Sequence, residues 1–285
     1  MTTSFDREPG DGLADDELPG YACMLHAYHR AHAANLRAII ATLPIAPGSL
    51  VLDVACGDAC YSIWLAERGA RVVGVDLSPA YLDLARRRAA DTMPASWISF
   101  ERADVMALPF EDGSFDLTWL AQSLFSLPEP LGVLREMIRV TRPGGHVAIL
   151  ENDTLHHLLL PWPAELELAV RRAQMATLAA RRAEGGLDKF YIGRNLCGLF
   201  RQCGIEACKI QTFPIDLRAP LDADEELFLR RYFADLREHA WQHLDEAAHA
   251  AFDMLFDPCA ATYLPRQPDF HLTHLETLAI GRVTG

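Results

Sequence analysis

The chain has 285 residues, half of them hydrophobic, and a formal net charge of −13. This length and composition predict a globular protein with a large buried core. The negative charge argues against binding to nucleic acids or anionic membranes, which requires clustered Lys and Arg. The seven cysteines include no C-x-x-C pair, so we expect neither a disulfide scaffold nor a zinc site, and no apolar run approaches the roughly 20 residues of a membrane span.

The first segment, residues 1–20, is acidic and poor in apolar residues. It predicts a flexible leader without a secretion signal, and therefore a cytoplasmic protein. Residues 21–46 are predicted to form a leading helix that ends near Leu43 and Pro44. Aromatic and apolar side chains recur on one face of this helix at Tyr21, Leu25, Tyr28, His32 and Leu36.

Residues 50–58 read Leu-Val-Leu-Asp-Val-Ala-Cys-Gly-Asp. The apolar start is typical of a parallel strand that is buried on both faces. Asp53 then places an acid at the carboxyl end of the strand, where open α/β sheets bind their ligands. Gly57 allows a sharp turn and a close approach of a ligand to the backbone N–H groups. We therefore predict a strand, a glycine turn and a helix that together begin a nucleotide pocket.

A second strand, residues 71–76, also ends in an acid. Asp76 follows Asp53 at close to the interval at which a nucleotide-binding βαβ unit places an acid on ribose hydroxyls. The turn after the first strand has a single glycine, Gly57, whereas a dinucleotide fingerprint reads G-x-G-x-x-G. This difference argues against NAD.

The stretch from Asp53 to Ala59 resembles motif I of the class I S-adenosylmethionine-dependent methyltransferases, in the variant D-x-A-C-G-x-G, with Ala59 in place of the last glycine. Other family motifs are matched in order by Val75–Ser78, Asp104–Val105, Phe115–Leu117 and Arg139–Gly145. The closest subgroup is the small-molecule enzymes of the ubiquinone-biosynthesis type, methyltransferase type 11/25. The resemblance covers residues 50–151, and the order of the motifs makes it specific.

The resemblance implies an α/β fold with a Rossmann-like, seven-stranded, mostly parallel sheet, an antiparallel last strand and helical lid insertions. In this sequence, residues 47–151 would form the cofactor-binding core and residues 152–190 a helical lid. Residues 191–285 would complete the core with the last two strands and a helical insertion at 216–268. We expect a monomer or a homodimer.

The resemblance also implies the cofactor S-adenosyl-L-methionine, which leaves as S-adenosyl-L-homocysteine. The ribose would bind Asp76 and the adenine amine Asp104, while a leading helix often closes over the cofactor in this family. Tyr28, His29 and Arg30 are candidates for that contact, although Tyr28 could equally pack in the core. The predicted cofactor-binding residues are Tyr28, Asp53, Ala55, Cys56, Gly57, Asp76, Leu77, Ser78, Asp104, Val105, Leu120, Ala121 and Gln122.

The catalytic residues are less well marked. The family often has His-His shortly after its fourth strand, but this chain has Phe125-Ser126 there. His156 and His157 follow the fifth strand, and a neutral imidazole can accept a proton near pH 7. With Tyr191 they are the catalytic candidates, and the alternative for each histidine is a helix-start residue on the surface. Arg194 could face the acceptor as well or could equally anchor the lid. We predict no metal ion.

Two helical insertions with many aromatic residues predict a covered apolar cavity, which favours a small organic acceptor. The predicted function is methyl transfer to an O or N atom, in preference to a C atom, of a fairly apolar molecule such as a quinone precursor or secondary metabolite. The transfer would be an in-line displacement. A non-catalytic S-adenosylmethionine-binding or scaffold protein is one alternative, and a nicotinamide-dependent oxidoreductase is disfavoured by the missing glycines.

Overall fold

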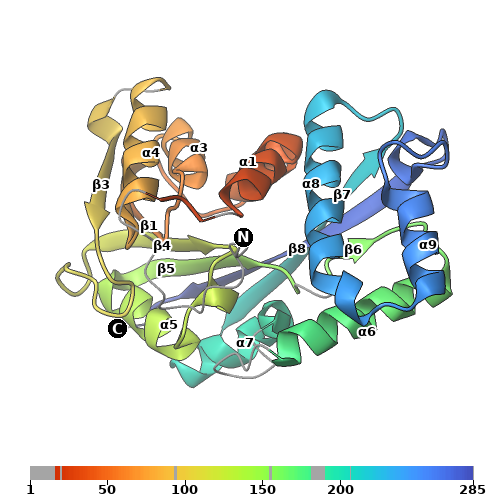
Figure 1. Ribbon diagram of the computed structural model, residues 1–285. Helices are drawn as coiled ribbons and strands as arrows, with labels where there is room; N and C mark the ends of the chain where they lie inside the picture. The colour runs from red at the N-terminus through yellow and green to blue at the C-terminus, as the bar shows by residue number, and fades with distance from the viewer. Residues whose placement is uncertain are drawn as a thin grey trace.

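The computed structural model describes residues 17–19, 21–92, 95–153, 156–180, 190–205 and 207–284. A mixed sheet runs through the centre of the molecule (Figure 1), with strands in the order β3-β2-β1-β4-β5-β8-β6 and with β7 also paired to β8. The strands are β1 (Leu50–Val54), β2 (Arg71–Asp76), β3 (Ile98–Arg102), β4 (Phe115–Ala121), β5 (Thr141–Glu151), β6 (Leu158–Leu159), β7 (Cys208–Arg218) and β8 (His271–Arg282).

Helices cover both faces of the sheet, with α1, α3 and α4 on one side and α5 and α7 on the other (Figure 1). The described helices are α1 (Ala22–Ala31), α2 (Ala33–Ala41), α3 (Cys60–Glu67), α4 (Pro79–Ala90), α5 (Pro130–Val140), α6 (Ala164–Ala180), α7 (Ile192–Gln202), α8 (Ala223–Ala240) and α9 (Glu246–Phe256). Short 3₁₀ turns occur at Ala95–Trp97, Leu124–Ser126, Trp241–His243 and Leu264–Arg266. No described helix is long and apolar enough to cross a membrane.

The first strand explains why the sheet is buried on both faces. Val51 and Leu52 point to opposite faces because successive side chains alternate along a strand. Val51 packs in the core cluster beneath α3, whereas Leu52 packs in the cluster beneath α5, and both are fully inaccessible to solvent. Each such side chain contributes roughly 1.5–3 kcal/mol of hydrophobic stabilisation. This burial confirms the sequence-based prediction of a strand covered on both sides.

The predicted fold class is confirmed. Strands β1 to β5 are parallel neighbours, and the last strand, β8, is antiparallel to both β5 and β7. One difference is the two-residue strand β6, which pairs with His274 and Thr273 of β8 as an addition to the seven expected strands. It lies at the head of the predicted lid, 152–190, where we expected only helix.

The leading helix also differs from the prediction, because residues 21–46 form two helices that meet at His32. The His32 side chain is fully buried and stacks on Tyr28 with 4.7 Å between ring centroids, and its ring is perpendicular to that of His274. These contacts hold His32 outside helical geometry, so the helix breaks there although His32 is neither glycine nor proline. Of the predicted leader, 1–20, only residues 17–19 are among the described residues.

Candidate functional site

The turn after β1 is anchored to α3 by Asp53, which is only 2% exposed. The Ser62 hydroxyl donates to Asp53 Oδ2 at 2.5 Å, and burial raises the pKa of Asp53 to about 7. Beyond Asp53 the backbone is left-handed at Ala55, Gly57 and Ala59, with φ of 55°, 50° and 64°. Three such residues within one short turn bend the chain sharply at the carboxyl end of β1, where the Cys56 N–H donates to the Val75 carbonyl of β2 at 2.9 Å.

Ala59, where the family has glycine, provides a stability prediction. A left-handed alanine is strained by roughly 1–2 kcal/mol, so Ala59→Gly relieves strain while it loses a buried methyl group and adds chain entropy. Ala66→Gly is the matched control, because Ala66 is equally buried but lies within α3. We expect Ala59→Gly to cost at least about 1 kcal/mol less than Ala66→Gly in urea unfolding. Equal costs would show that Ala59 is unstrained.

Asp76 joins the end of β2 to this turn. The Gly57 N–H donates to Asp76 Oδ2 at 2.9 Å, and the Ser78 N–H donates to Oδ1 at 2.9 Å. Each carboxylate oxygen keeps acceptor capacity, so Asp76 is oriented to receive two further donors, as a ribose diol offers. Ser78 also caps α4, where its Oγ accepts from the Tyr81 N–H. The structure therefore joins the predicted motif at the turn after β1 to the predicted motif at the end of β2.

Of the other predicted cofactor-binding residues at this edge of the sheet, some are exposed and some are buried. Leu77 is 60% exposed, whereas Cys56 and Val105 are buried. Asp104 is exposed after β3, and its Oδ1 accepts from the Met106 N–H at 2.8 Å, so the loop holds its carboxylate in place.

At the end of β4, Leu120 and Ala121 are buried and Gln122 turns the chain with a φ of 50°. A left-handed glutamine is uncommon, and such strain concentrates at functional sites. Gln122 Nε2 donates to the Tyr28 hydroxyl at 2.6 Å, while its Oε1 accepts from the Tyr61 hydroxyl at 3.3 Å. The predicted cofactor contacts Tyr28 and Gln122 therefore meet, although Tyr28 lies on α1 and Gln122 follows β4.

Tyr28 and Gln122 converge on Glu276 of β8, which is completely buried. Glu276 Oε1 accepts from the Tyr28 hydroxyl at 2.6 Å, from Gln122 Nε2 at 3.0 Å and from Asn152 Nδ2 at 3.2 Å. His274 Nε2 lies 3.2 Å from the same oxygen. Burial raises the pKa of Glu276 to about 7 and lowers that of His274 well below its ordinary value. The cluster thus pairs a titrating acid with a neutral imidazole.

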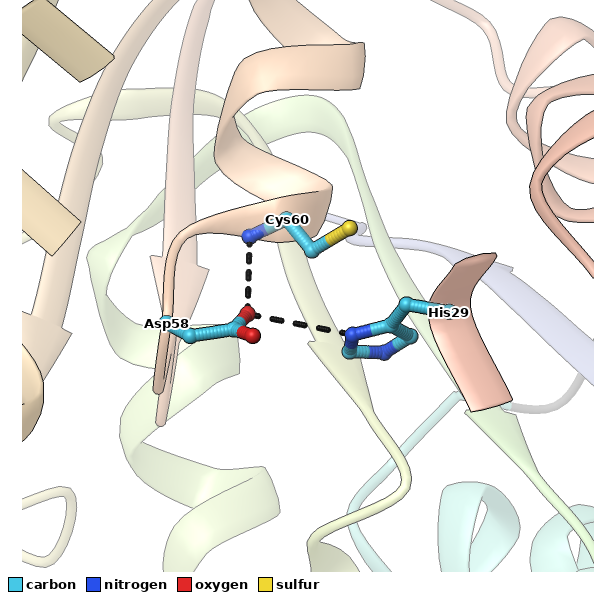
Figure 2. A group of neighbouring side chains, drawn as sticks. All are labelled: His29, Asp58 and Cys60. Carbon is cyan, nitrogen blue, oxygen red and sulfur yellow. Dashed lines mark hydrogen bonds and ion pairs between the residues drawn. The ribbon is translucent and has the colours of Figure 1, made fainter. Parts of the chain in front are cut away.

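Helix α1 lies across the turn, and Figure 2 shows its contact: His29 Nδ1 lies 3.8 Å from Asp58 Oδ1, and that oxygen accepts from the Cys60 N–H at 3.1 Å. Among the described residues, His29, Asp58 and Cys60 form a group whose ligand atoms lie within 4.8 Å of one another. Asp58 is already ion-paired with Arg88 of α4, and burial raises the pKa of the Cys60 thiol, which disfavours a thiolate. We interpret the group as an anchor for α1, and the absence of a metal stays a prediction.

Of the three predicted catalytic residues, His157 lies beside the Glu276 cluster, with its ring 5.2 Å from that of His274, whereas His156 and Tyr191 lie at another surface. His156 and His157 line an open pocket of about 270 Å³, and the Tyr191 ring lies 5.6 Å from that of His156. Leu275 and Thr277 line this pocket too. Side chains alternate along a strand, so His274 and Glu276 face the opposite side of β8. His156 and Tyr191 are thus separated by β8 from the side chains that converge on Glu276, and their catalytic role stays a prediction.

Sequence analysis did not identify Glu276. The sequence of β8 could have indicated it, because alternate side chains of a strand share one face. Leu272, His274, Glu276 and Leu278 lie on the same face and are all buried. An acid on the buried face of a strand, with His274 and Leu278 as its neighbours there, is costly unless it has partners. Asp58 and Arg88 were also missed, because their pairing depends on how α4 packs beside the turn.

Comparisons with known proteins place the chain in a family. A model of a methyltransferase domain matches residues 52–149. The 27-O-demethylrifamycin SV methyltransferase of Amycolatopsis mediterranei (strain S699) is 35% identical over 206 residues, which are 72% of this chain and 70% of that protein. The chain belongs to the class I S-adenosylmethionine-dependent methyltransferases. The resemblance seen in the motifs of residues 50–151 is thereby confirmed.

Further likenesses of this methyltransferase are more limited. A demethylmenaquinone methyltransferase of Bacillus cereus (strain ATCC 10987 / NRS 248) is 35% identical over 125 residues, or 43% of this chain and 52% of that protein. The chain spans 40% and 70% of the first two curated relatives that it matches. The crystal structure of a putative methyltransferase from Bacillus halodurans C-125 has a TM-score of 0.55 at 14% identity, covering 88% of this chain and 100% of that one, and it shows the shared fold.

The cofactor of the methyltransferase family fits the donor set at the carboxyl edge. Asp76 presents two held carboxylate oxygens, and the left-handed turn places no side chain at Gly57, where an added Cβ would come no nearer than 4.0 Å to Tyr81. A ribose diol and the backbone of the turn could therefore meet without a steric barrier. The prediction of S-adenosylmethionine is confirmed at the level of the family.

Proposed function

We propose that this methyltransferase transfers a methyl group to an O or N atom of a small, fairly apolar organic molecule. The observation that carries the proposal is the pairing of the Asp76 carboxylate with the Gly57 N–H at the carboxyl edge of the sheet. It is supported by the relatives, whose names identify demethylrifamycin and demethylmenaquinone as their substrates. We further propose a cytoplasmic monomer or homodimer that does not bind nucleic acid, consistent with a net charge of −13.

S-adenosylmethionine, when bound, supplies a methyl group on a positively charged sulfur. The task left to the protein is to hold the acceptor in line and to exclude water. Tyr28 of α1 packs edge-on against Phe228 of α8, with 5.8 Å between ring centroids, and Phe228 contacts Tyr232. Arg30 and Asp224 form an ion pair between the same two helices. We propose that α1 and the insertion 216–268 cover the acceptor, with 152–190 as a second lid.

The cofactor pocket is tested by calorimetric titration of S-adenosylhomocysteine into the wild type and Asp76→Asn. We expect micromolar binding that weakens at least tenfold in the variant, because a charge-assisted hydrogen bond worth about 1.4 kcal/mol is lost. Asp116→Asn is the matched control, since Asp116 also accepts a backbone N–H, from Leu50, but at the opposite edge of the sheet. It should bind like the wild type. Failure of the wild type to bind would refute the cofactor assignment.

Methyl transfer is tested by incubating the protein with S-adenosylmethionine carrying a labelled methyl group and a panel of apolar alcohols, phenols and amines. Label in an extracted product is the expected result. Binding of S-adenosylhomocysteine without transfer to any member would favour the non-catalytic alternative. Binding of NADH in place of S-adenosylhomocysteine would favour the oxidoreductase.

A further inference from the structure

One oxygen of the Glu276 carboxylate accepts hydrogen bonds, whereas the other accepts none from the described residues. Oε1 accepts three hydrogen bonds, from Tyr28, Gln122 and Asn152. Oε2 is buried and has no hydrogen-bond partner among the described residues. A carboxylate oxygen removed from water without a donor is strongly unfavourable, so Oε2 is the place in this cluster where a donor is missing.

The donors to Oε1 come from separate parts of the fold. Tyr28 belongs to α1, Gln122 follows β4, Asn152 follows β5, and Glu276 itself lies on β8. They meet at the carboxyl edge of the central strands, beyond which ligands bind in open α/β sheets. Gln122 also joins Tyr61 of α3, the helix that begins after the cofactor turn. Glu276 is therefore one hydrogen bond away from two residues that the sequence assigns to the cofactor pocket, Tyr28 and Gln122.

A purely structural role does not explain this arrangement. Buried ionisable groups can often be replaced by apolar side chains without loss of stability, and on its face of β8 Glu276 lies between the buried residues His274 and Leu278. Gln122 keeps a left-handed backbone where it donates to Glu276. Backbone strain at Gln122 and a buried carboxylate oxygen without a hydrogen bond at Glu276 occur together, and proteins retain such features at functional sites.

We propose that Glu276 is a catalytic residue whose Oε2 binds and deprotonates the hydroxyl group of an apolar, hydroxyl-bearing acceptor. This inference rests on the proposed methyl transfer. The acceptor oxygen forms a bond to the methyl carbon as the bond from that carbon to sulfur breaks with its electron pair on sulfur. The hydroxyl proton moves to Oε2, and the resulting carboxylic acid returns it to water after the product leaves. Atoms and charge balance, because the positive charge of the sulfonium leaves as the proton.

The surroundings of Glu276 favour a neutral, apolar acceptor. The Tyr28 ring packs against Phe228 and His32, and burial lowers the pKa of His32 to about 4. With His32 and His274 uncharged, neither imidazole competes as a cation for the carboxylate. The three donors to Oε1 fix the orientation of the side chain, so that Oε2 is left for the acceptor.

The test uses the complex with S-adenosylhomocysteine and two probes, 1-naphthol and 1-methoxynaphthalene. The second probe has a methyl group in place of the hydroxyl hydrogen of the first, so it cannot donate a hydrogen bond to Oε2. We expect the wild-type complex to prefer 1-naphthol at least tenfold in calorimetry. E276Q should lose this preference, and E276D, which keeps a carboxylate, should retain part of it. E151Q is the matched control, because Glu151 is an equally buried acid whose Oε1 accepts the Leu124 N–H. It should keep the full preference.

Affinity for S-adenosylhomocysteine serves as the check on folding and should stay within threefold in every variant. If E276Q keeps the preference for 1-naphthol, or if E151Q loses it to the same extent, the assignment of Glu276 is overturned. A wild-type complex that binds S-adenosylhomocysteine but shows no preference between the probes overturns it as well. Failure of the wild type to bind S-adenosylhomocysteine is a different result, because it refutes the cofactor assignment itself.

Discussion

Replacing Arg88 with methionine is expected to lower the free energy of unfolding by about 3 kcal/mol. The Arg88 guanidinium pairs with Asp58, whose side chain is only 5% exposed, and also contacts His26 Nδ1 at 2.6 Å. Methionine keeps most of the apolar stem but leaves the Asp58 carboxylate buried without its cation. We take the lower end of the usual range for a broken buried pair because a quarter of the Arg88 side chain is exposed.

Arg86→Met is the matched control for this prediction, since Arg86 lies on the same helix and pairs with Asp83 at the surface. Exposed pairs of this kind contribute roughly 0–1 kcal/mol. Urea unfolding of both variants near neutral pH measures the difference. Equal losses would show that the contact between Arg88 and Asp58 does not stabilise the fold.

The pH dependence of Arg88→Met follows from Asp58. Burial by itself raises the pKa of this carboxyl, but His29 and Arg88 outweigh burial and lower it to about 2. A lowered pKa means that the contribution to stability is present above the unfolded pKa of about 4 and is lost as the pH falls toward 2. The wild type should therefore lose this contribution between about pH 4 and pH 2, and Arg88→Met should show a smaller loss over that window.

The second large effect is expected from Glu276 in the protein without cofactor. Its pKa is raised to about 7 by burial, against which the hydrogen bonds from Tyr28, Asn152 and Gln122 act. A raised pKa in an acid means that the folded state holds the proton more tightly, so stability is full below about pH 4 and declines as the pH rises to about 7. The rise of this pKa from 4.5 to about 7 corresponds to roughly 3 kcal/mol at most, because a tenfold change in a proton equilibrium corresponds to about 1.36 kcal/mol.

E276Q removes this titration, because an amide stays neutral at every pH. We expect the variant to unfold about 10 °C higher than the wild type at pH 8, from roughly 2–4 °C for each kcal/mol in a chain of this size. At pH 4 the two should differ much less. Differential scanning calorimetry across this range gives the comparison, with E101Q as control because Glu101 is exposed on β3. Parallel profiles for E276Q and the wild type would contradict a buried, titrating Glu276.

Asp53 should contribute to the same decline in stability, since burial raises its pKa to about 7 as well. Some downward slope is therefore expected to remain in E276Q. Because Asp53 lies in the cofactor turn and Glu276 at the end of the sheet, their contributions should add for the double variant Asp53→Asn, Glu276→Gln. Scans of the double variant over the same pH range measure that sum.

The local chemistry of the cofactor turn could be predicted from sequence. An apolar run that ends in Asp53, a turn at Gly57 and an acid at Asp76 specify a parallel strand, a tight turn and a second strand, because each signal depends on residues close in the chain. The structure joins Gly57 and Asp76 by a hydrogen bond, as the motif implies. The break of the leading helix at His32 had no such local signal, since it depends on packing against Tyr28 and His274.

The sequence by itself determined the family, the positions of the first strands along the chain and the acids at their ends, because these depend on patterns within about 30 residues of a βαβ unit. Only the tertiary structure brought together Tyr28 of α1, Gln122 after β4 and Glu276 of β8. Their contact depends on where a distant antiparallel strand pairs in the sheet and on how the leading helix packs over it. Neither is encoded by spacing along the chain, because burial and hydrogen-bond satisfaction are properties of the whole fold.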